Sequence, residues 1–410
     1  MPTRWLLLIV GVALTRAGEL QDVKEAQLRY KGAQVLRVEA VKNNVQKDVI
    51  KKMQDEQVVD IWQIPAVEGG TQVDIMVPAV SLKQVKATLK NVSATFKVMI
   101  QDVGAAIRNQ NPVLKEGNNK RMARKGHRMT FQNYHRVSDI HGYLEYLART
   151  FPDLVSVQTI GSSVEGRPLK LIKITGSNAD PKPAFYIDGG IHAREWISPT
   201  SVTYIIQELV ENRDKYKFMD AIDFYIVPVV NPDGYEYTHN GVRLWRKKNT
   251  CAGTDLDKNF GYKWDGAGSS HDPCQETYAF RNFVSSLGVS VRAYVTFHSY
   301  GQYILYPWGY DKKVPPDYDL DRIGKKAANK MREVAGASYT VGNSASLLYA
   351  ASGGADDLAK GGSRIKYTYT IQLRDRGQYG FLLPASSIVP TGKEAFAAIQ
   401  TISEEIAADG

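Results

Sequence analysis

Two side chains that can bind a metal ion, His192 and Glu195, lie three positions apart where a predicted strand turns into a predicted helix. Residues 184–188 are short, apolar and β-prone, and two glycines follow them. Residues 197–212 then repeat apolar side chains at helical spacing. An imidazole nitrogen and a carboxylate oxygen are both ligands for zinc. The pair alone is weak evidence, since two such residues often share a polar turn by chance, so a zinc site requires a third ligand.

His298 is the candidate third ligand, because it follows another predicted strand at residues 292–297. A histidine at a strand end is often only a hydrogen-bonded structural residue. Together with His192 and Glu195, however, His298 completes a set of two histidines and one carboxylate. Catalytic zinc sites use three protein ligands of this kind and leave a fourth position for water. The sequence therefore predicts a zinc site.

Alternating strands and helices must position these ligands, and they run from about residue 129 to the end of the chain. The predicted helices lie at 138–147, where Ser138 is the expected N-cap, and at 197–212, 320–334 and 394–407. The predicted strands lie at 155–160, 169–175, 184–188, 224–230, 292–297, 303–306 and 365–371. Alternation over this length predicts one α/β domain with a mixed, mostly buried sheet flanked by helices.

A smaller unit precedes this domain. Residues 33–101 are predicted to form strand, helix, strand, strand, helix and strand, the split βαβ order of a small ferredoxin-like α+β domain. Its predicted strands lie at 33–40, 58–63, 73–77 and 96–100, and its predicted helices at 45–53 and 82–89. No group of side chains in this unit suggests catalysis.

The N-terminus and the composition restrict the class of protein. Residues 1–17 match a secretory signal peptide, with Arg4, an apolar core and a small-residue cleavage site. No other segment is apolar enough to span a membrane, so we expect a secreted protein without a membrane partner. The net charge is +9, but the basic residues are scattered, which argues against a nucleic-acid partner. The two cysteines, Cys251 and Cys274, favour a disulfide in an oxidising compartment.

Residues 109–128 separate the two units and concentrate Lys and Arg among Asn, Gly and Pro. A charge run of this kind is often only a solvated segment. In a secreted protein, an exposed basic linker is also a substrate for a trypsin-like protease. The residues alone leave both interpretations open.

Several short motifs then occur in an order that makes the resemblance specific. They are HAREW at 192–196, NPDGY at 231–235, RLWRK at 243–247, HSY at 298–300, YAASGG at 349–354, LRD at 373–375 and YGFLLP at 379–384. The chain resembles a secreted procarboxypeptidase of the A/B family of zinc metallocarboxypeptidases over nearly its whole length. The resemblance implies a signal peptide at 1–17, an inhibitory pro-domain at 18–108, an activation linker at 109–128 and a zinc carboxypeptidase domain at 129–410.

The resemblance also implies roles for single residues and a set of partners. Zinc is bound by His192, Glu195 and His298, and Asp255 holds a ligand imidazole from behind. The resemblance further implies that Arg246 polarises the scissile carbonyl and that Tyr349 closes over the bound C-terminus. It implies that Arg194, Ser299 and Tyr300 line the substrate path. It also implies a disulfide between Cys251 and Cys274. The implied partners are peptide or protein C-termini and a trypsin-like activating protease that cuts the linker.

Asp356 points to the specificity. It occupies the position at which family members selective for C-terminal Lys or Arg have an aspartate. A buried carboxylate at the floor of a pocket needs a cationic partner, which such a substrate supplies. The alternative is that Asp356 pairs with a basic residue of the protein itself.

Three departures from the family pattern bear on activity. Gln372 stands at the position of the catalytic glutamate. Asp257 and Lys258 replace the Asn-Arg pair that grips the substrate carboxylate, and lysine lacks the bidentate fork of arginine. The segment between Tyr278 and Phe283 is shorter than in the family.

Two hypotheses of different class follow. The first is a zinc metallocarboxypeptidase that removes C-terminal residues, Lys or Arg by preference, through zinc-bound water, with turnover strongly reduced because Gln372 replaces the general base. The second is a non-catalytic relative that binds zinc and peptide C-termini. Gln372 is the residue that distinguishes them, because an amide cannot accept a proton near neutral pH.

Overall fold

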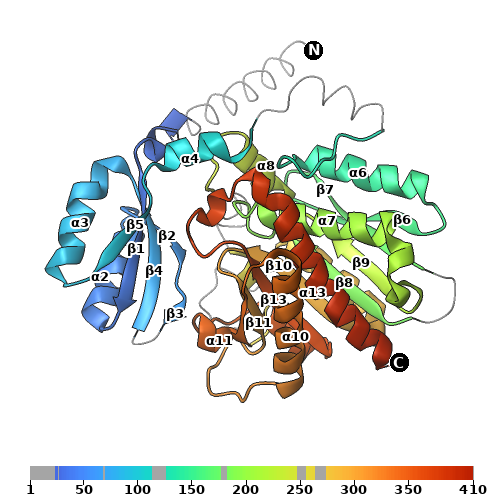
Figure 1. Ribbon diagram of the computed structural model, residues 1–410. Coiled ribbons are helices and arrows are strands. Elements are labelled where there is room, and N and C mark those ends of the chain that lie inside the picture. Colours follow the sequence, from blue (N-terminus) through green and yellow to red (C-terminus); the bar gives the residue numbers. More distant parts are fainter. Residues whose placement is uncertain are drawn as a thin grey trace, which may run out of the picture.

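The computed structural model describes residues 24–25, 27–67, 70–112, 126–176, 182–246, 255–263 and 274–409. The predicted signal peptide, Cys251 and most of the predicted linker lie outside the described residues. Figure 1 shows two folded units, one formed by the blue and cyan part of the chain and the other by the green to red part.

The first unit is a five-stranded antiparallel sheet covered on one face by two helices (Figure 1). Its strands follow the order β2-β4-β1-β5 with β3 paired to β4, and they are β1 (Gln34–Val41), β2 (Asp60–Gln63), β3 (Ala66–Val67), β4 (Gly70–Val77) and β5 (Phe96–Ile100). The covering helices are α2 (Asn44–Asp55) and α3 (Leu82–Asn91). The predicted ferredoxin-like order of elements is confirmed.

The second unit is built on an eight-stranded sheet in the order β12-β11-β13-β10-β8-β9-β7-β6. Its strands are β6 (Val155–Ser162), β7 (Pro168–Thr175), β8 (Ala184–Gly189), β9 (Asp223–Val227), β10 (Val291–Ser299), β11 (Tyr303–Tyr306), β12 (Thr340–Asn343) and β13 (Tyr367–Leu373). The four central strands, β13, β10, β8 and β9, run parallel, whereas β6, β7 and β11 add antiparallel pairings. The predicted mixed sheet is confirmed.

Helices cover both faces of this sheet, as its continuous apolar strands require. Along β8, Phe185 and Ile187 face a large core on one side, while Tyr186 faces a second core on the other. The large core is closed by α6 (Val137–Thr150), α7 (Ile197–Glu211), α10 (Tyr318–Ala335) and α13 (Ile388–Ala408). The second core is closed by α9 (Gln275–Leu287) and by loops. Along β10 and β13, Phe297 and Ile371 face the large core. Side chains alternate along a strand, so the neighbouring His298 and Gln372 lie on the side of the second core.

Some element boundaries differ from the prediction. The prediction of Ser138 as the N-cap of α6 was wrong: the helix begins at Val137, whose amide donates to Glu236 Oε1 at 2.8 Å, so a distant carboxylate satisfies the helix end. Strand β9 ends three residues earlier than predicted, and α13 begins six residues earlier. Several elements were not predicted: α4 (Val103–Gln110), α8 (Pro232–His239), α9 and β12. The short segment 278–283 lies inside the continuous helix α9.

Candidate functional site

The predicted metal ligands lie where the parallel strands β8 and β10 end. The carboxyl ends of parallel strands meet at one edge of a sheet, where ligands commonly bind. His298 is in β10, and in the register with β13 it lies opposite Gln372. His192 follows the turn that leaves β8. This turn is tight: a Cβ at Gly189 would lie 2.7 Å from Ser198 Oγ, so only glycine lets the chain enter α7 here.

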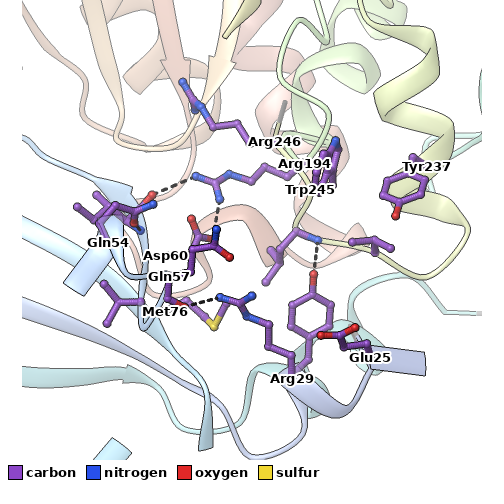
Figure 2. A pocket seen from close by; sticks show the side chains of 15 residues that line it. Glu25, Arg29, Gln54, Gln57, Asp60, Met76, Arg194, Tyr237, Trp245 and Arg246 are labelled. Atoms are coloured by element: carbon purple, nitrogen blue, oxygen red, sulfur yellow. Dashed lines mark hydrogen bonds and ion pairs between the residues drawn. The ribbon is translucent and has the colours of Figure 1, made fainter. Parts of the chain in front are cut away.

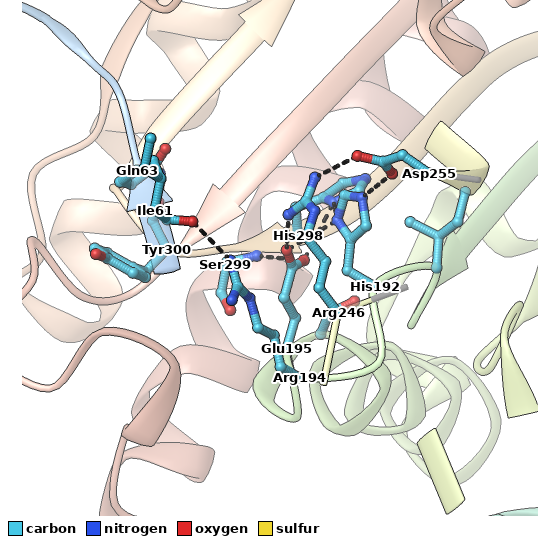
Figure 3. Close-up of polar contacts among 12 residues, drawn as sticks. Ile61, Gln63, His192, Arg194, Glu195, Arg246, Asp255, His298, Ser299 and Tyr300 are labelled. Carbon is cyan, nitrogen blue, oxygen red and sulfur yellow. Dashed lines mark hydrogen bonds and ion pairs between the residues drawn. The ribbon is translucent and has the colours of Figure 1, made fainter. Parts of the chain in front are cut away.

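Three donor atoms converge at this edge. The Nδ1 atoms of His192 and His298 are 3.1 Å apart, and Glu195 Oε1 lies 2.9 Å from the first of them. Glu195 Oε2 lies 3.2 Å from Nδ1 of His298. Figure 3 shows the three side chains turned toward one another. Donor atoms of a tetrahedral zinc site are about 3.3 Å apart, so two imidazoles and a carboxylate in this arrangement fit one zinc ion.

The outer nitrogen, Nε2, of each imidazole ring also has a partner. Asp255 Oδ1 accepts a hydrogen bond from Nε2 of His192 at 3.0 Å, which leaves the lone pair of Nδ1 directed toward Glu195. Thr296 Oγ1 lies 3.2 Å from Nε2 of His298 in the same way. A partner on the outer nitrogen fixes the tautomer and the ring orientation of a metal-binding histidine. The centre is therefore organised before any metal arrives.

Electrostatics favour a cation at this point. Burial alone would raise the pKa of the Glu195 carboxyl, but His192 and His298 hold it well below its usual value. Burial alone would lower the pKa of His298, but the Glu195 carboxylate outweighs it and raises this pKa to about 9. Burial also opposes ionisation of Asp255, yet Arg246 and His192 keep its pKa well below the ordinary value. The buried carboxylates thus stabilise positive charge between them.

The predicted catalytic neighbours lie around this centre. The guanidinium of Arg246 contacts Asp255 Oδ2 at 3.0 Å and approaches Glu195 Oε1 at 3.7 Å, so it lies beside the donor set. Tyr349 is 42% exposed, and the ammonium of Lys258 lies 5.3 Å from the centroid of its ring. Gln372 is adjacent to His298 across the strand pairing, and its Oε1 is buried without a hydrogen-bond partner among the described residues.

Asp257 lies closer to the metal ligands than the sequence indicates. The sequence predicts for it a place beside the substrate carboxylate. In the structure, donor atoms of Asp257, His192 and His298 all lie within 4.8 Å of one another. No motif spacing could have revealed this, because the approach depends on the short 3-10 turn Leu256–Lys258 that carries Asp257 toward the ends of β8 and β10.

Asp356 is a buried carboxylate surrounded by hydroxyl and amide donors. Its carboxylate accepts hydrogen bonds from Ser344 Oγ at 3.2 Å, from Thr370 Oγ1 at 3.3 Å and from the amide of Asp357 at 2.9 Å. Within the described ranges, no Lys or Arg pairs with it. Burial, followed by the charge of Asp257, raises the pKa of Asp356. This carboxylate therefore lacks the protein cation that the alternative interpretation requires.

The first unit covers the predicted substrate path. Arg194 is 1% exposed, and it donates to Asp60 Oδ2 at 2.9 Å and to the carbonyl of Ile61 at 3.3 Å. The hydroxyl of Tyr300 donates to Asp74 Oδ2 at 2.8 Å, and Gln63 donates to the carbonyl of Tyr300. Figure 3 places Ile61 and Gln63 of the first unit beside Arg194 and Tyr300. Ser299, between these residues, donates its amide to Glu195 at 3.0 Å.

The contact between the units is a packed interface with a cavity beside it. Tyr30, Trp62 and Met76 of the first unit share an apolar cluster with Tyr300 and Phe381 of the second. Next to it, a cavity of about 720 Å³ is lined by residues of both units, including Gln57, Asp60, Arg194, Trp245 and Arg246 (Figure 2).

The end of α4 also anchors the first unit. The side chain of Gln110 is 2% exposed and donates to the carbonyls of Phe381 and Leu383 at 3.1 and 3.2 Å. Its Oε1 accepts from Arg243 at 2.7 Å. The sequence does not reveal these covering and anchoring residues, because nothing in a local pattern marks a side chain that contacts another folded unit.

Comparison with known proteins identifies two families along the chain. Residues 140–398 match the family model described as zinc carboxypeptidase, and residues 37–110 match the carboxypeptidase activation peptide. The chain is 42% identical to carboxypeptidase B of Astacus astacus over 67% of this chain and 97% of that protein. It is 34% identical to carboxypeptidase A1 of Sus scrofa over 98% of both chains.

Solved structures give the same result. The crystal structure of thrombin activatable fibrinolysis inhibitor superimposes with a TM-score of 0.80, at 32% identity, over 93% of this chain and all of that one. The carboxypeptidase A of Helicoverpa armigera matches with a TM-score of 0.78, at 29% identity, over 93% of this chain and 98% of that one. The likeness extends over both units.

Proposed function

This chain belongs to the zinc carboxypeptidase family and includes that family's activation peptide, and we propose that it is a zymogen-type protein that removes C-terminal residues from peptides only slowly. Its cofactor is zinc. The proposed ligands are His192, Glu195 and His298, supported by the convergence of their donor atoms within 3.2 Å. Bound zinc supplies Lewis-acid polarisation of the scissile carbonyl and a lowered pKa of the attacking water.

The observation that determines the proposed rate is Gln372. Its side chain is adjacent to His298, at the place where hydrolysis needs a group that takes a proton and later returns it to the leaving amine. A carboxylate performs both steps, whereas an amide can hydrogen-bond but cannot accept a proton near neutral pH. A positioned general base contributes about 10²–10⁴ in rate, or roughly 3–5 kcal/mol. Arg246, beside Glu195, remains available to stabilise the developing oxyanion.

The proposed specificity is for C-terminal Lys or Arg. Support comes from the buried Asp356, which has hydroxyl and amide donors but no basic partner in the described part of the chain. A substrate cation would compensate the cost of keeping this carboxylate charged and buried. Tyr349 and Lys258, which lie together, would contact the terminal carboxylate, with Lys258 acting as a point charge.

The zymogen form explains why Arg194 and Tyr300 are covered. We propose a pro-domain at 18–108, a linker at 109–128 and a catalytic unit at 129–410, activated by a trypsin-like protease. Limited trypsin treatment should release a folded unit that begins between about Arg121 and Met129. First cuts within residues 140–400 would contradict this.

The compartment and the disulfide belong to the same proposal. We propose that residues 1–17 direct secretion and that Cys274 pairs with Cys251. Among the described residues no helix is both long and apolar enough to cross a membrane. The described part of the chain contains no free cysteine.

A non-catalytic role is the second candidate. Gln372 Oε1 has no hydrogen-bond partner among the residues that the structure describes, which favours this role, because the atom can accept a hydrogen bond from a bound peptide or water without performing proton transfer. Both candidates share the metal centre and differ only in turnover.

The test is the hydrolysis of Arg-ended, Phe-ended and Glu-ended peptides by the trypsin-treated protein and by its Gln372→Glu variant. We expect very slow wild-type turnover and a rise of at least about a hundredfold in the variant. Fast wild-type hydrolysis that the substitution leaves unchanged would refute the proposal and indicate another base.

A further inference from the structure

We propose that Asp257 is a fourth protein ligand of the zinc ion, so that the centre is a closed site of two histidines, one glutamate and one aspartate. This inference rests on the proposed zinc set His192, Glu195 and His298 and extends it by one residue. It concerns the number of positions left on the metal, which no sequence motif defines.

The geometry brings Asp257 within reach. Its donor oxygen and the donor nitrogens of His192 and His298 lie within 4.8 Å of one another. In a tetrahedral zinc site with bonds of about 2.0–2.2 Å, donor atoms are about 3.3 Å apart. A shift of the carboxylate by at most about 1.5 Å would bring it into this range.

The local chain directs Asp257 to the metal. Asp255 and Asp257 flank Leu256 on one short turn, and Asp255 already holds the outer nitrogen of His192 at 3.0 Å. Leu256 is buried in the second core and fixes the turn between them. The turn therefore carries one carboxylate behind the imidazole of His192 and a second carboxylate near a donor nitrogen of each histidine.

The carboxylate of Asp257 is also unengaged. The structure shows no hydrogen bond or ion pair between its side chain and another described residue, although it is only partly exposed. A partly buried anion without a partner is costly, and a zinc ion would remove that cost.

The consequence is a change in the type of site. Catalytic zinc sites have three protein ligands and an open position, whereas four protein ligands close the tetrahedron and are typical of structural zinc. The family pattern has asparagine at position 257, and a neutral amide is a weaker ligand than a carboxylate. Because the water position is then open only when Asp257 is displaced, this fourth ligand would lower the turnover of wild type and of Gln372→Glu alike.

Cobalt(II) in place of zinc gives a readout without catalysis, because its visible absorption depends on coordination geometry. We would load the full-length wild type, Asp257→Asn and Asp356→Asn with cobalt and titrate each with azide, a small anion that binds open metal positions. Asp356→Asn is the matched control, since it removes a nearby carboxylate with the same charge change. Zinc affinity would be measured on the same three proteins by competition with a chelator.

We expect no spectral change with azide in wild type and in Asp356→Asn, and a saturable change in Asp257→Asn. Zinc affinity should fall at least about tenfold in Asp257→Asn, because even the loss of a hydrogen-bond partner of a metal ligand lowers metal affinity by about tenfold or more. In Asp356→Asn it should fall less than about threefold, because this change removes neither a ligand nor a partner of one. Azide binding by the cobalt-loaded wild type would refute Asp257 as a ligand and leave the three-ligand site standing. A wild type that binds no metal would overturn the three-ligand site and the fourth ligand together.

Discussion

Two halves of the candidate site differ in how far the protein itself provides partners for their side chains. In the metal half, formed by His192, Glu195, Asp255 and His298, every side chain has a protein partner within 3.2 Å. In the substrate half, formed by Lys258, Asp356 and Gln372, the described structure leaves Gln372 Oε1 unpartnered and gives Asp356 no cation. The metal half is organised by the fold alone, whereas the substrate half depends on a ligand.

The elements that position each half explain this difference. The metal half is built on the ends of β8 and β10, which belong to the central parallel strands. The substrate half includes a short turn and a glycine loop that pack closely: a Cβ at Gly353 would lie 2.6 Å from the carbonyl oxygen of Lys258, at a φ of +82°. Lys258 and Gln372, two of the three positions at which we propose a departure from the family pattern, belong to the substrate half.

The largest effect should follow from breaking the metal half directly. His298→Ala leaves two of the three proposed ligands, so the protein should lose most of its zinc, which we expect at about one ion per purified wild-type chain. Metal analysis after dialysis gives the result. Unchanged zinc content would show that the zinc ion is not bound at this site.

A smaller loss should follow from Asp255→Ala. This change removes the hydrogen bond at 3.0 Å behind His192 but no ligand, so zinc affinity should fall about 10–100-fold. The measurement is a chelator competition. A loss as large as that of His298→Ala would mean that Asp255 itself binds the metal.

In the substrate half, Asp356→Ile should reverse the order of preference between Arg-ended and Phe-ended peptides by about tenfold or more. The substituted pocket has no charge to balance and gains apolar surface. Peptide binding, or residual cleavage, would be compared with wild type at equal zinc content. The same preference in both proteins would show that Asp356 is not the selector.

The contact of the first unit with Arg194 should give the smallest effect. Asp60→Ala removes the carboxylate 2.9 Å from Arg194, a charged hydrogen bond of about 1.5 kcal/mol or about tenfold in binding. After the linker is cut, less of the first unit should stay bound in gel filtration, with zinc content unchanged. Asp48→Ala, at an exposed aspartate of α2, is the control. Equal retention in wild type and Asp60→Ala would exclude this contact as an anchor.

The sequence predicted the metal half more completely than the substrate half. The apolar run of β8 and the histidine at the end of β10 are local signals, and parallel pairing then brings the ends of these strands together. The proximity of Asp257 to His192 and His298, and the contacts of Asp60 and Asp74 with Arg194 and Tyr300, join residues far apart in the chain. Such contacts depend on how turns and units pack, and no periodicity encodes them.

The boundaries illustrate the same limit. The start of α6 depends on the distant Glu236, and α4 ends in Gln110, which is buried by the second unit. The predicted linker begins at residue 109, inside α4, because the residues that anchor the end of this helix lie elsewhere in the chain. Local capping and turn rules do not contain this information.

The most direct measurement of the central claim combines zinc content and turnover on the same trypsin-treated samples of wild type, Gln372→Glu and the triple variant Gln372→Glu/Asp257→Asn/Lys258→Arg. With zinc saturating, we expect one zinc per chain in all three. We expect kcat/KM to rise at least about a hundredfold in the single variant. It should rise further in the triple variant, which regains the arginine fork and loses a negative charge beside the substrate carboxylate. A zinc-loaded wild type as fast as either variant would contradict the account.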